Sequence, residues 1–560
     1  MYSLKIKNGT IVDGTGSPRF RGDIAIAHGR IAEIGKISSG AERVLDASDL
    51  VVAPGFIDQH THYDAQVFWD PYFTSSSWHG VTSVVTGNCG FTLAPCRPEN
   101  REYITRMLAV VEDMSLAALQ AGLPWGWEDY RSFLAAIERR PKALNMGCLV
   151  GHSAIRRDVL GAGFRRPANG PEITTMQELT VQALLAGALG LSTSRQPLHA
   201  DGDGDHVPSF YADMEELSAL ARAVGKVGRG IIEVSSKMVA TPRSDSETGD
   251  LADLVWLAKT SGRPVTWASV RYLPRFPGRC MNILAETSKA IAEQGVRLFP
   301  QIGARPIDLH LNWHKLMPVF AHLPTWRKVM FLPAHEMTDA LRDPAIRAAM
   351  RAELAGPNVF SGWQFVYVEK AKRPEHKSLE GQSITALAAA QGKDPLDAYL
   401  DLCIAEDCDT DFICQTADNS DQALGRMLKH PNTLLETDAG AHLSSICNAD
   451  FPTYLLSHWV RDTGILSLED AVARLTTYPA DAFGLTDRGR IKPGFPADVV
   501  LFDPLRVGSV KPRLVQDLPA NQSRLIREAE GIHSVIVNGE IVMQGTKPSG
   551  AFPGQVLKGA

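Results

Sequence analysis

The chain has 560 residues, of which 44% are hydrophobic and 21% are charged. Its 63 acidic residues outnumber its 57 basic ones, so the net charge of -6 argues against a protein that binds polyanions such as nucleic acids. The composition is that of a globular protein, which excludes a disordered chain and a small disulfide-stapled scaffold. The length allows one large core with an accessory domain, or two or three domains.

Short runs that alternate apolar and polar residues begin the chain. They are LKIKNGTIVDG, DIAIAHGRIAEIG and RVLDASDLVVAPG, each bounded by Gly, Asn or Asp, as is typical of strands joined by hairpins. The same pattern returns near the C-terminus, at 488–504 and 532–545. We therefore predict one small β-sandwich domain assembled from residues 1–52 and 486–550.

The middle of the chain repeats a different unit, in which a short apolar run precedes an Ala- and Leu-rich stretch with helical spacing. Strands are predicted at 51–59, 81–87, 143–151, 188–194, 229–235, 263–269, 296–302 and 432–437. The alternation favours an α/β fold, a (β/α)8 TIM-like barrel over residues 53–485, with its chemistry at the C-terminal ends of the strands. A doubly wound sheet stays open as an alternative, because periodicity does not show closure.

The spacing between the last two predicted strands is much longer than the others. A connection of that length is rarely without structure, so we predict a helical insertion at 303–431, before the last barrel strand. The segments 338–354 and 394–407 have the composition of helices and support this expectation.

Cysteine usage and the N-terminal segment bear on where the protein resides. The eight cysteines are scattered without a CxxC pair, which argues against a zinc ribbon or a disulfide framework. The segment MYSLKIKNGTIVDGTG has no basic region followed by an apolar run, so no signal peptide is indicated. We expect a cytoplasmic protein with no membrane partner.

Two histidines follow the first predicted barrel strand, in VVAPGFIDQHTHYD. His60 and His62 are two residues apart, so in an extended chain both imidazoles lie on one side and can bind one ion. Neutral imidazole is a good ligand for zinc and similar divalent metals. Their position favours a metal site, although one histidine could instead cap the strand while the other is solvated.

Two more residues end predicted strands and could take part in the same chemistry. Cys89 lies in a Gly-Asn-Cys-Gly turn, where its thiolate could bind the metal or where it could be a small buried apolar residue. Asp438 ends the last strand, in NTLLETDAGAHL, where a carboxylate can take a proton from water and pass it to a leaving amine. It could equally be the N-cap of a following helix.

Together these motifs make the chain resemble the amidohydrolase superfamily and, within it, the N-acyl-D-amino-acid deacylases, or D-aminoacylases. The resemblance is carried by GFIDQHTHYD (55–64), GNCGFTLAP (87–95), LVGHSAIR (149–156), GALGLSTS (187–194), ETDAGAHL (436–443), TTYPADAFGL (476–485) and GRIKPGFPADVVLFDP (489–504). It implies a metal-dependent barrel beside a β-sandwich built from both termini. It also implies that His60 and His62 are first-strand metal ligands, Cys89 the metal-binding cysteine and Asp438 the catalytic aspartate.

The sequence departs from this family at the ends of the fifth and sixth strands, where D-aminoacylases carry histidine ligands. The corresponding segments RGIIEVSSK (229–237) and PVTWASVRY (264–272) contain none. Glu233 lies near the missing fifth-strand ligand, and a carboxylate can hold zinc. We expect a divalent metal, with zinc as the first choice, held by His60, His62 and Asp438 with Cys89 or Glu233 as a further ligand.

Substrate recognition has weaker signals. An acyl-amino-acid carboxylate is well matched by an arginine or lysine at the pocket rim. Arg156, Arg195, Lys237 and Arg271 follow predicted strands and are candidates, although each could be an ordinary surface charge. His152 matches the GHS motif of the family, which implies a pocket residue that orients substrate.

The expected function is metal-dependent hydrolysis of an amide bond, other than a peptide bond, in a small molecule, with Asp438 as general base and acid. The alternatives are an ester, lactone, cyclic imide or carbon–carbon bond on the same machinery, or a degenerate barrel that binds without turnover. A small-molecule substrate is the expected partner, with no nucleic acid; relatives raise the expectation of a homo-oligomer.

Overall fold

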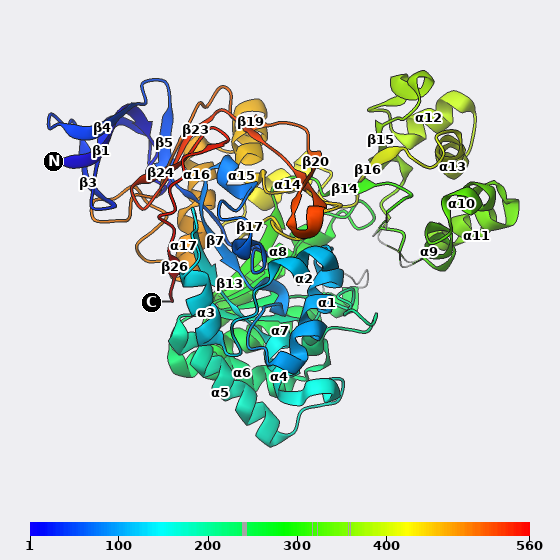
Figure 1. The fold of residues 1–560 in the computed structure, drawn as a ribbon, viewed down its shortest axis with the longest axis horizontal. Helices are drawn as coiled ribbons and strands as arrows, with labels where there is room; N and C mark the ends of the chain where they lie inside the picture. The colour runs from blue at the N-terminus through cyan, green and yellow to red at the C-terminus, as the bar shows by residue number, and fades with distance from the viewer. Residues whose placement is uncertain are drawn as a thin grey trace. The chain divides into compact units, whose positions relative to one another are not determined.

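A computed structural model describes residues 1–237, 244–315, 317, 319–321, 323–356, 358 and 360–559, and of 244–249 the backbone alone. The chain divides into two compact units (Figure 1). The first contains Met1–Val270, Cys280–Ala304 and Gly425–Ala560, and the second contains Arg271–Arg279 and Arg305–Leu424. Within the described ranges, no helix has both the length and the apolar character needed to cross a membrane.

Parallel strands form the centre of the first unit. They are β6 (Phe56–Asp58), β7 (Val81–Thr86), β8 (Asn145–Cys148) with β9 (Val150–Gly151), β10 (Gly190–Ser194), β11 (Ile231–Ser235), β12 (Val265–Ala268), β13 (Leu298–Gly303) and β17 (Leu434–Glu436). Each of the eight predicted strand segments overlaps at least one of these strands. Their residues are almost all buried, which explains why the sequence shows continuous apolar runs there and no alternation.

The strands form two parallel arcs that meet at both ends. One arc has the order β26-β8-β7-β6, where β26 (Val556–Leu557) is the C-terminal strand, and the other has the order β17-β13-β12-β11-β10-β9. Residues 145–151 belong to both arcs through β8 and β9. On the other side, Thr61 pairs in parallel with Ala439, and the His62 amide donates to the Ala439 carbonyl at 2.8 Å. The first and last strands are therefore joined, as in a barrel and unlike a doubly wound sheet.

Helices follow most of these strands and lie outside them (Figure 1). They include α1 (Arg101–Val111), α3 (Tyr130–Glu138), α4 (His152–Leu160), α5 (Gly170–Ala186), α6 (Met214–Val227), α7 (Ser244–Ser261) and α8 (Arg279–Gln294). Local sequence sets their starts: Asn169 caps α5 in a reciprocal capping box with Glu172, and Asp213 accepts a hydrogen bond from the Glu216 amide at the start of α6.

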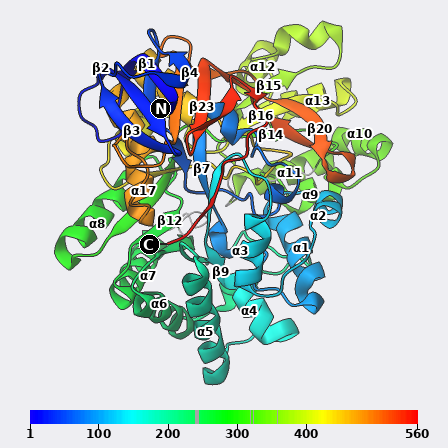
Figure 2. The ribbon, with the colours of Figure 1, turned by 60° about the vertical axis from the view of Figure 1, so that its left-hand side comes forward.

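A nine-stranded sheet contains strands from both ends of the chain. The N-terminal strands are β1 (Tyr2–Ile11), β2 (Phe20–Ala27), β3 (Arg30–Gly35), β4 (Ala41–Asp46) and β5 (Val51–Pro54), and the C-terminal ones are β18 (Val499–Phe502), β23 (Ile532–Val537), β24 (Glu540–Gln544) and β25 (Lys547–Pro548). The two sets join where β5 pairs antiparallel with β18, Val52 opposite Leu501. Figures 1 and 2 show the blue N-terminal strands beside the red C-terminal ones.

The second unit holds the segment that the sequence predicts as a helical insertion, but it is not purely helical. Its helices are α9 (Pro324–Met330), α10 (Ala334–Arg342), α11 (Pro344–Ala355), α12 (Ile384–Gln391) and α13 (Pro395–Ala405). They accompany an antiparallel sheet of β14 (Asp308–Leu311), β16 (Asp411–Gln415) and β15 (Val366–Lys370). These strands are four or five residues long, too short for their alternation to be visible in the sequence. The predicted helix at 338–354 is divided at Asp343, which caps α11 immediately before Pro344.

Candidate active site

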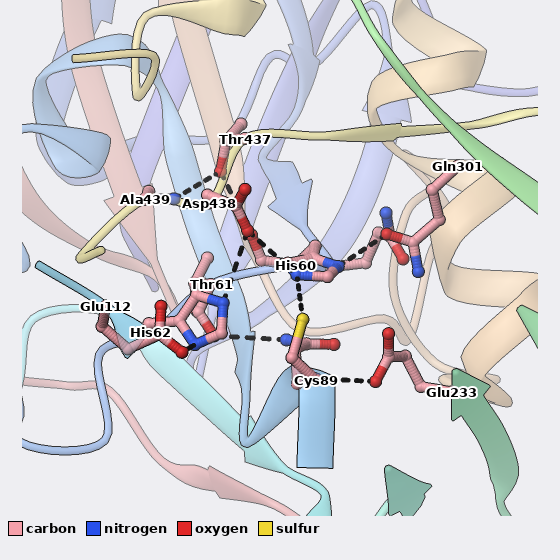
Figure 3. A network of polar contacts seen from close by, with 12 residues as sticks. His60, Thr61, His62, Cys89, Glu112, Glu233, Gln301, Thr437, Asp438 and Ala439 are labelled. Carbon is pink, nitrogen blue, oxygen red and sulfur yellow. Dashed lines mark hydrogen bonds and ion pairs between the residues drawn. The ribbon is translucent and has the colours of Figure 1, made fainter. Parts of the chain in front are cut away.

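His60 and His62 lie in the extended segment that follows β6. The Thr61 amide donates to the Val85 carbonyl at 3.0 Å, and the His62 amide donates to the Ala439 carbonyl, so both neighbouring strands hold this backbone. The residue between the histidines points the other way, and both imidazoles are buried, with 0% and 3% exposure. Figure 3 shows the two rings converging on the same point, as the spacing predicts.

Cys89 is brought to the histidines by the turn after β7. Cys89 has a φ of 56° between Gly87 and Gly90, whose φ values of 80° and 79° are readily adopted only by glycine. This conformation aims the thiol inward, and Sγ lies 3.5 Å from His60 Nε2. One ligand atom from each of His60, His62 and Cys89 lies within 4.8 Å of the others, which is close enough for a single metal ion.

Asp438, which follows the last strand of the barrel in chain order, is the fourth member of the cluster. It follows β17 with a φ of 58°, and its Oδ1 lies 3.0 Å from His60 Nε2 and 3.4 Å from His62 Nε2. Desolvation would raise the pKa of this carboxyl, but the positive charge and hydrogen bonds of the two histidines hold it well below its ordinary value. The side chain is 30% exposed, so Asp438 is the part of the cluster that solvent reaches.

Gln301 on β13 sets which nitrogen of His60 faces the cluster. The hydroxyl of Thr266 donates to the Phe299 carbonyl at 2.7 Å, so its oxygen is free to accept from the Gln301 amide nitrogen at 3.0 Å. The Gln301 amide oxygen then faces His60 Nδ1 at 2.6 Å. An amide oxygen only accepts, so Nδ1 carries a proton and Nε2 is the nitrogen that faces the cluster.

Glu112 plays the same part for His62. Its Oε1 lies 3.0 Å from His62 Nδ1, and both side chains are 3% exposed. Burial alone would raise the pKa of Glu112, but the positive charge of His62 lowers it overall. The carboxylate therefore fixes His62 with Nε2 toward Asp438 (Figure 3).

Glu233 on β11 lies on the other side of Cys89. Its Oε2 accepts the Cys89 amide at 2.7 Å, while its buried Oε1 has no hydrogen-bond partner among the described residues. Desolvation raises its pKa to about 7. A buried oxygen without a partner is costly, so a cation that reached this atom would satisfy it. The donor set of imidazole, thiolate and carboxylate therefore fits a divalent metal.

The residues expected to bind substrate differ in what they contact. His152 is fully buried with its Nδ1 2.9 Å from Thr193 Oγ1 and its Nε2 2.7 Å from Glu216 Oε1, so both ring nitrogens are used inside the fold. Arg156 is also fully buried, ion-paired with Glu216 and bonded to the carbonyls of Phe164 and Arg166. In the structure these two residues join α4 to α6, and a role for them in substrate binding stays a prediction.

The other three candidates follow strands, as predicted, but differ in their surroundings. Arg195 follows β10, is 12% exposed, and pairs with Asp253 of α7. Lys237 follows β11 and is half-buried. Arg271 belongs to the second unit, where it binds the buried Asp418 at 2.8 Å.

Sequence reasoning missed the residues that orient the two histidines. Gln301 lies in the C-terminal half of β13, a strand that was predicted, so its polar side chain in an apolar run is a signal that could have found it. Glu112 directly follows helix α1, far from any motif, and nothing in the local sequence distinguishes it. Its role depends on tertiary packing alone.

The chain is similar to proteins of known activity over nearly its whole length. A family model described as the amidohydrolase family matches residues 43–543. An N-acyl-D-glutamate deacylase of Alcaligenes xylosoxydans xylosoxydans is 30% identical over 567 residues, which cover 99% of this chain and 96% of the relative.

Two solved structures extend the similarity to three dimensions. A D-aminoacylase described as having a binuclear metal centre with one-metal activation is 26% identical and superposes with a TM-score of 0.69, with 100% of each chain covered. An N-acyl-D-glutamate deacylase from Bordetella bronchiseptica, complexed with zinc and a phosphonate inhibitor, is 27% identical with a TM-score of 0.67 and covers 100% and 99% of the two chains.

Proposed function

Because this chain belongs to the amidohydrolase family, we propose that it is a metal-dependent hydrolase that cleaves an amide bond, other than a peptide bond, in a small molecule. N-acyl-D-amino acids are the first substrate class to test, since the similar deacylases act on them. The observation that supports this proposal most strongly is the convergence of His60, His62, Cys89 and Asp438 at one end of the barrel.

The proposed metal ligands are His60, His62, Cys89, Asp438 and Glu233. Imidazole and thiolate together suit zinc better than calcium or magnesium, which prefer oxygen ligands. When bound, a divalent metal would polarise the substrate carbonyl and lower the pKa of water. The histidines of the fifth and sixth strands that the family resemblance implies have no counterpart, because β11 ends at Ser235 and β12 at Ala268. A single ion is therefore the proposed stoichiometry.

Asp438 performs the proton transfer in this proposal. Its lowered pKa keeps the carboxylate ionised, and its partial exposure lets an attacking water approach its oxygens. The carboxylate takes the proton of that water and then delivers it to the departing nitrogen, so the aspartate ends in its starting form.

The missing strand-end histidines also favour a second candidate, a different carbonyl substrate on the same machinery. Hydrolysis of esters, lactones and cyclic imides needs the same attack by water on a carbonyl carbon. Only the leaving group differs from that of a linear amide. A carbon–carbon bond or a barrel without turnover would need a different use of the cluster. The division into a composite β-domain (1–52 with 486–550), a barrel (53–485) and an inserted unit (303–431) remains our proposal beside these.

A substrate panel tests the proposed function. Purified protein loaded with zinc is incubated with N-acyl-D-amino acids, their L-enantiomers, cyclic imides and lactones, and the release of amine or acid is measured before and after treatment with a chelator. We expect chelator-sensitive release of amine from an N-acyl-amino acid. Turnover that persists unchanged in metal-free protein, or no turnover of any amide, would contradict the proposal.

A further inference from the structure

His199 lies in the connection between β10 and α6. The ring is half-buried and packs against Phe91 with 5.2 Å between ring centroids. Phe91 directly follows the turn that holds Cys89, and β10 contacts the same turn through Ser192, which accepts the Gly90 amide at 3.1 Å. His199 is therefore held at the end of the barrel where the clustered side chains lie.

The hydrogen bonds of Ser194 define the tautomer of His199. The Ser194 hydroxyl oxygen accepts the Gln196 amide at 3.2 Å and lies 2.8 Å from His199 Nδ1. Because no other acceptor lies within reach of this hydroxyl in the described part of the chain, its proton points to Nδ1. Nδ1 therefore accepts, and the proton of the neutral ring is on Nε2. No described protein group takes the Nε2 hydrogen.

The electrostatic surroundings keep this ring neutral. Burial lowers the pKa of His199 to about 4, and the groups whose charges also act on it are Glu112, His442, Asp438 and His62. Three of these belong to the candidate site. The ring therefore stays neutral at neutral pH.

The arginines expected at the pocket rim do not supply this donor. Arg156 is enclosed within the fold, and Arg195 is paired with Asp253. Among the described residues near the cluster, His199 presents an N–H that no protein group uses.

We propose that His199 is a substrate-contacting residue whose Nε2–H donates to the carbonyl oxygen of the scissile amide. This inference rests on the proposed amide hydrolysis. As water attacks, the carbonyl oxygen gains negative charge, so the hydrogen bond strengthens in the transition state while its proton stays on Nε2. Ser194 is the positioning residue, because its hydroxyl holds the ring in the donating tautomer.

The test compares His199→Ala, His199→Gln and His199→Asn in zinc-loaded protein. Loss of one oxyanion donor lowers kcat by about 100-fold, and we expect this for alanine with little change in KM. Glutamine places an amide N–H near the position of Nε2, so we expect it to restore most of kcat. Asparagine reaches only the position of Nδ1 and should not. His206→Ala is the matched control, since His206 lies in the same connection and packs against Phe210 with 3.9 Å between ring centroids.

Binding of a phosphonate analogue of an N-acyl-amino acid, measured by calorimetry, separates the two proposals. We expect His199→Ala to bind it at least tenfold more weakly while retaining its zinc and its thermal unfolding midpoint. If the wild type hydrolyses an amide and His199→Ala has the same kcat and the same phosphonate affinity, the role of His199 is overturned. The proposed function is then left intact. A wild-type protein that neither hydrolyses amides nor binds the phosphonate would overturn both.

Discussion

Exposure distinguishes the roles of the residues in the cluster. His60, His62 and Cys89 are 0%, 3% and 6% exposed, whereas the Asp438 side chain is 30% exposed. The buried groups suit constant contact with an ion, and the exposed carboxylate suits exchange of a proton with water. Sequence motifs located all four, but only the structure shows this difference in exposure.

Asp438→Asn removes the base while keeping a side chain of nearly the same shape. We expect kcat to fall by about 100- to 10,000-fold, the usual contribution of general acid–base catalysis. Because His60, His62 and Cys89 remain, the zinc content should stay above half of the wild-type value. Kinetics and elemental analysis of the same preparation check this prediction. A variant with near-normal kcat would exclude the proton-transfer role.

Gln301→Leu removes the acceptor that holds the Nδ1 proton of His60. His60 can then expose either tautomer, so we expect the affinity for zinc to fall about 10- to 100-fold. Gln301→Glu keeps an acceptor oxygen and serves as the matched control, with affinity near wild type. Competition with a fluorescent zinc chelator measures both variants. Equal affinities in the leucine and glutamate variants would show that Gln301 does not orient the histidine.

At the scale of elements, the buried Glu216 joins α6 to α4 through His152 and Arg156. Removing one partner of a buried ion pair leaves an uncompensated charge, so we expect Glu216→Gln to lower the free energy of unfolding by about 3–5 kcal/mol. Urea unfolding near neutral pH measures it. Glu178→Gln, an exposed change on α5, is the control. A loss no larger than that of the control would mean that the pair does not stabilise the fold.

The pKa of Glu216 determines how the stability of the fold should change with pH. Burial alone would raise the pKa of Glu216, but hydrogen bonds and charge from His152 and Arg156 lower it below its ordinary value of 4.5. A carboxyl with a lowered folded-state pKa stabilises the fold above its unfolded-state pKa, and this stabilisation is lost as the pH falls through the folded-state value. We expect the urea midpoint of wild type to drop more steeply below about pH 4.5 than that of Glu216→Gln. Parallel pH profiles would contradict this.

At the scale of the whole molecule, the C-terminal strand ties the end of the chain to the barrel. In β26, Val556 pairs with Met146, and Leu557 is 7% exposed within a core cluster that includes Val85, Leu149 and Leu189. We expect Leu557→Ala to cost about 2–5 kcal/mol of unfolding free energy. Leu505→Ala is the matched control, because Leu505 is 80% exposed. A cost equal to that of the control would show that the strand does not contribute to the core.

The sequence predicts the parts of this fold that repeat and misses those that depend on distant contacts. The barrel strands carry long apolar runs because both faces are buried, so their positions could be predicted. The strands of the second unit are too short for the alternation of apolar and polar residues to be visible in the sequence. His60, His62, Cys89 and Asp438 each follow a strand and lie in a motif, whereas the proposed roles of Glu112 and of the Ser194–His199 pair depend on packing alone.

Metal content shows whether the clustered histidines and cysteine hold an ion. Protein purified without chelator or added metal is analysed by elemental mass spectrometry, with His60→Ala prepared in parallel. We predict about one zinc or similar divalent ion per chain in the wild type and its loss in the variant, as expected for a structured site with imidazole and thiolate ligands. No retained metal in the wild type, even after supplementation, would contradict a metal-dependent hydrolase.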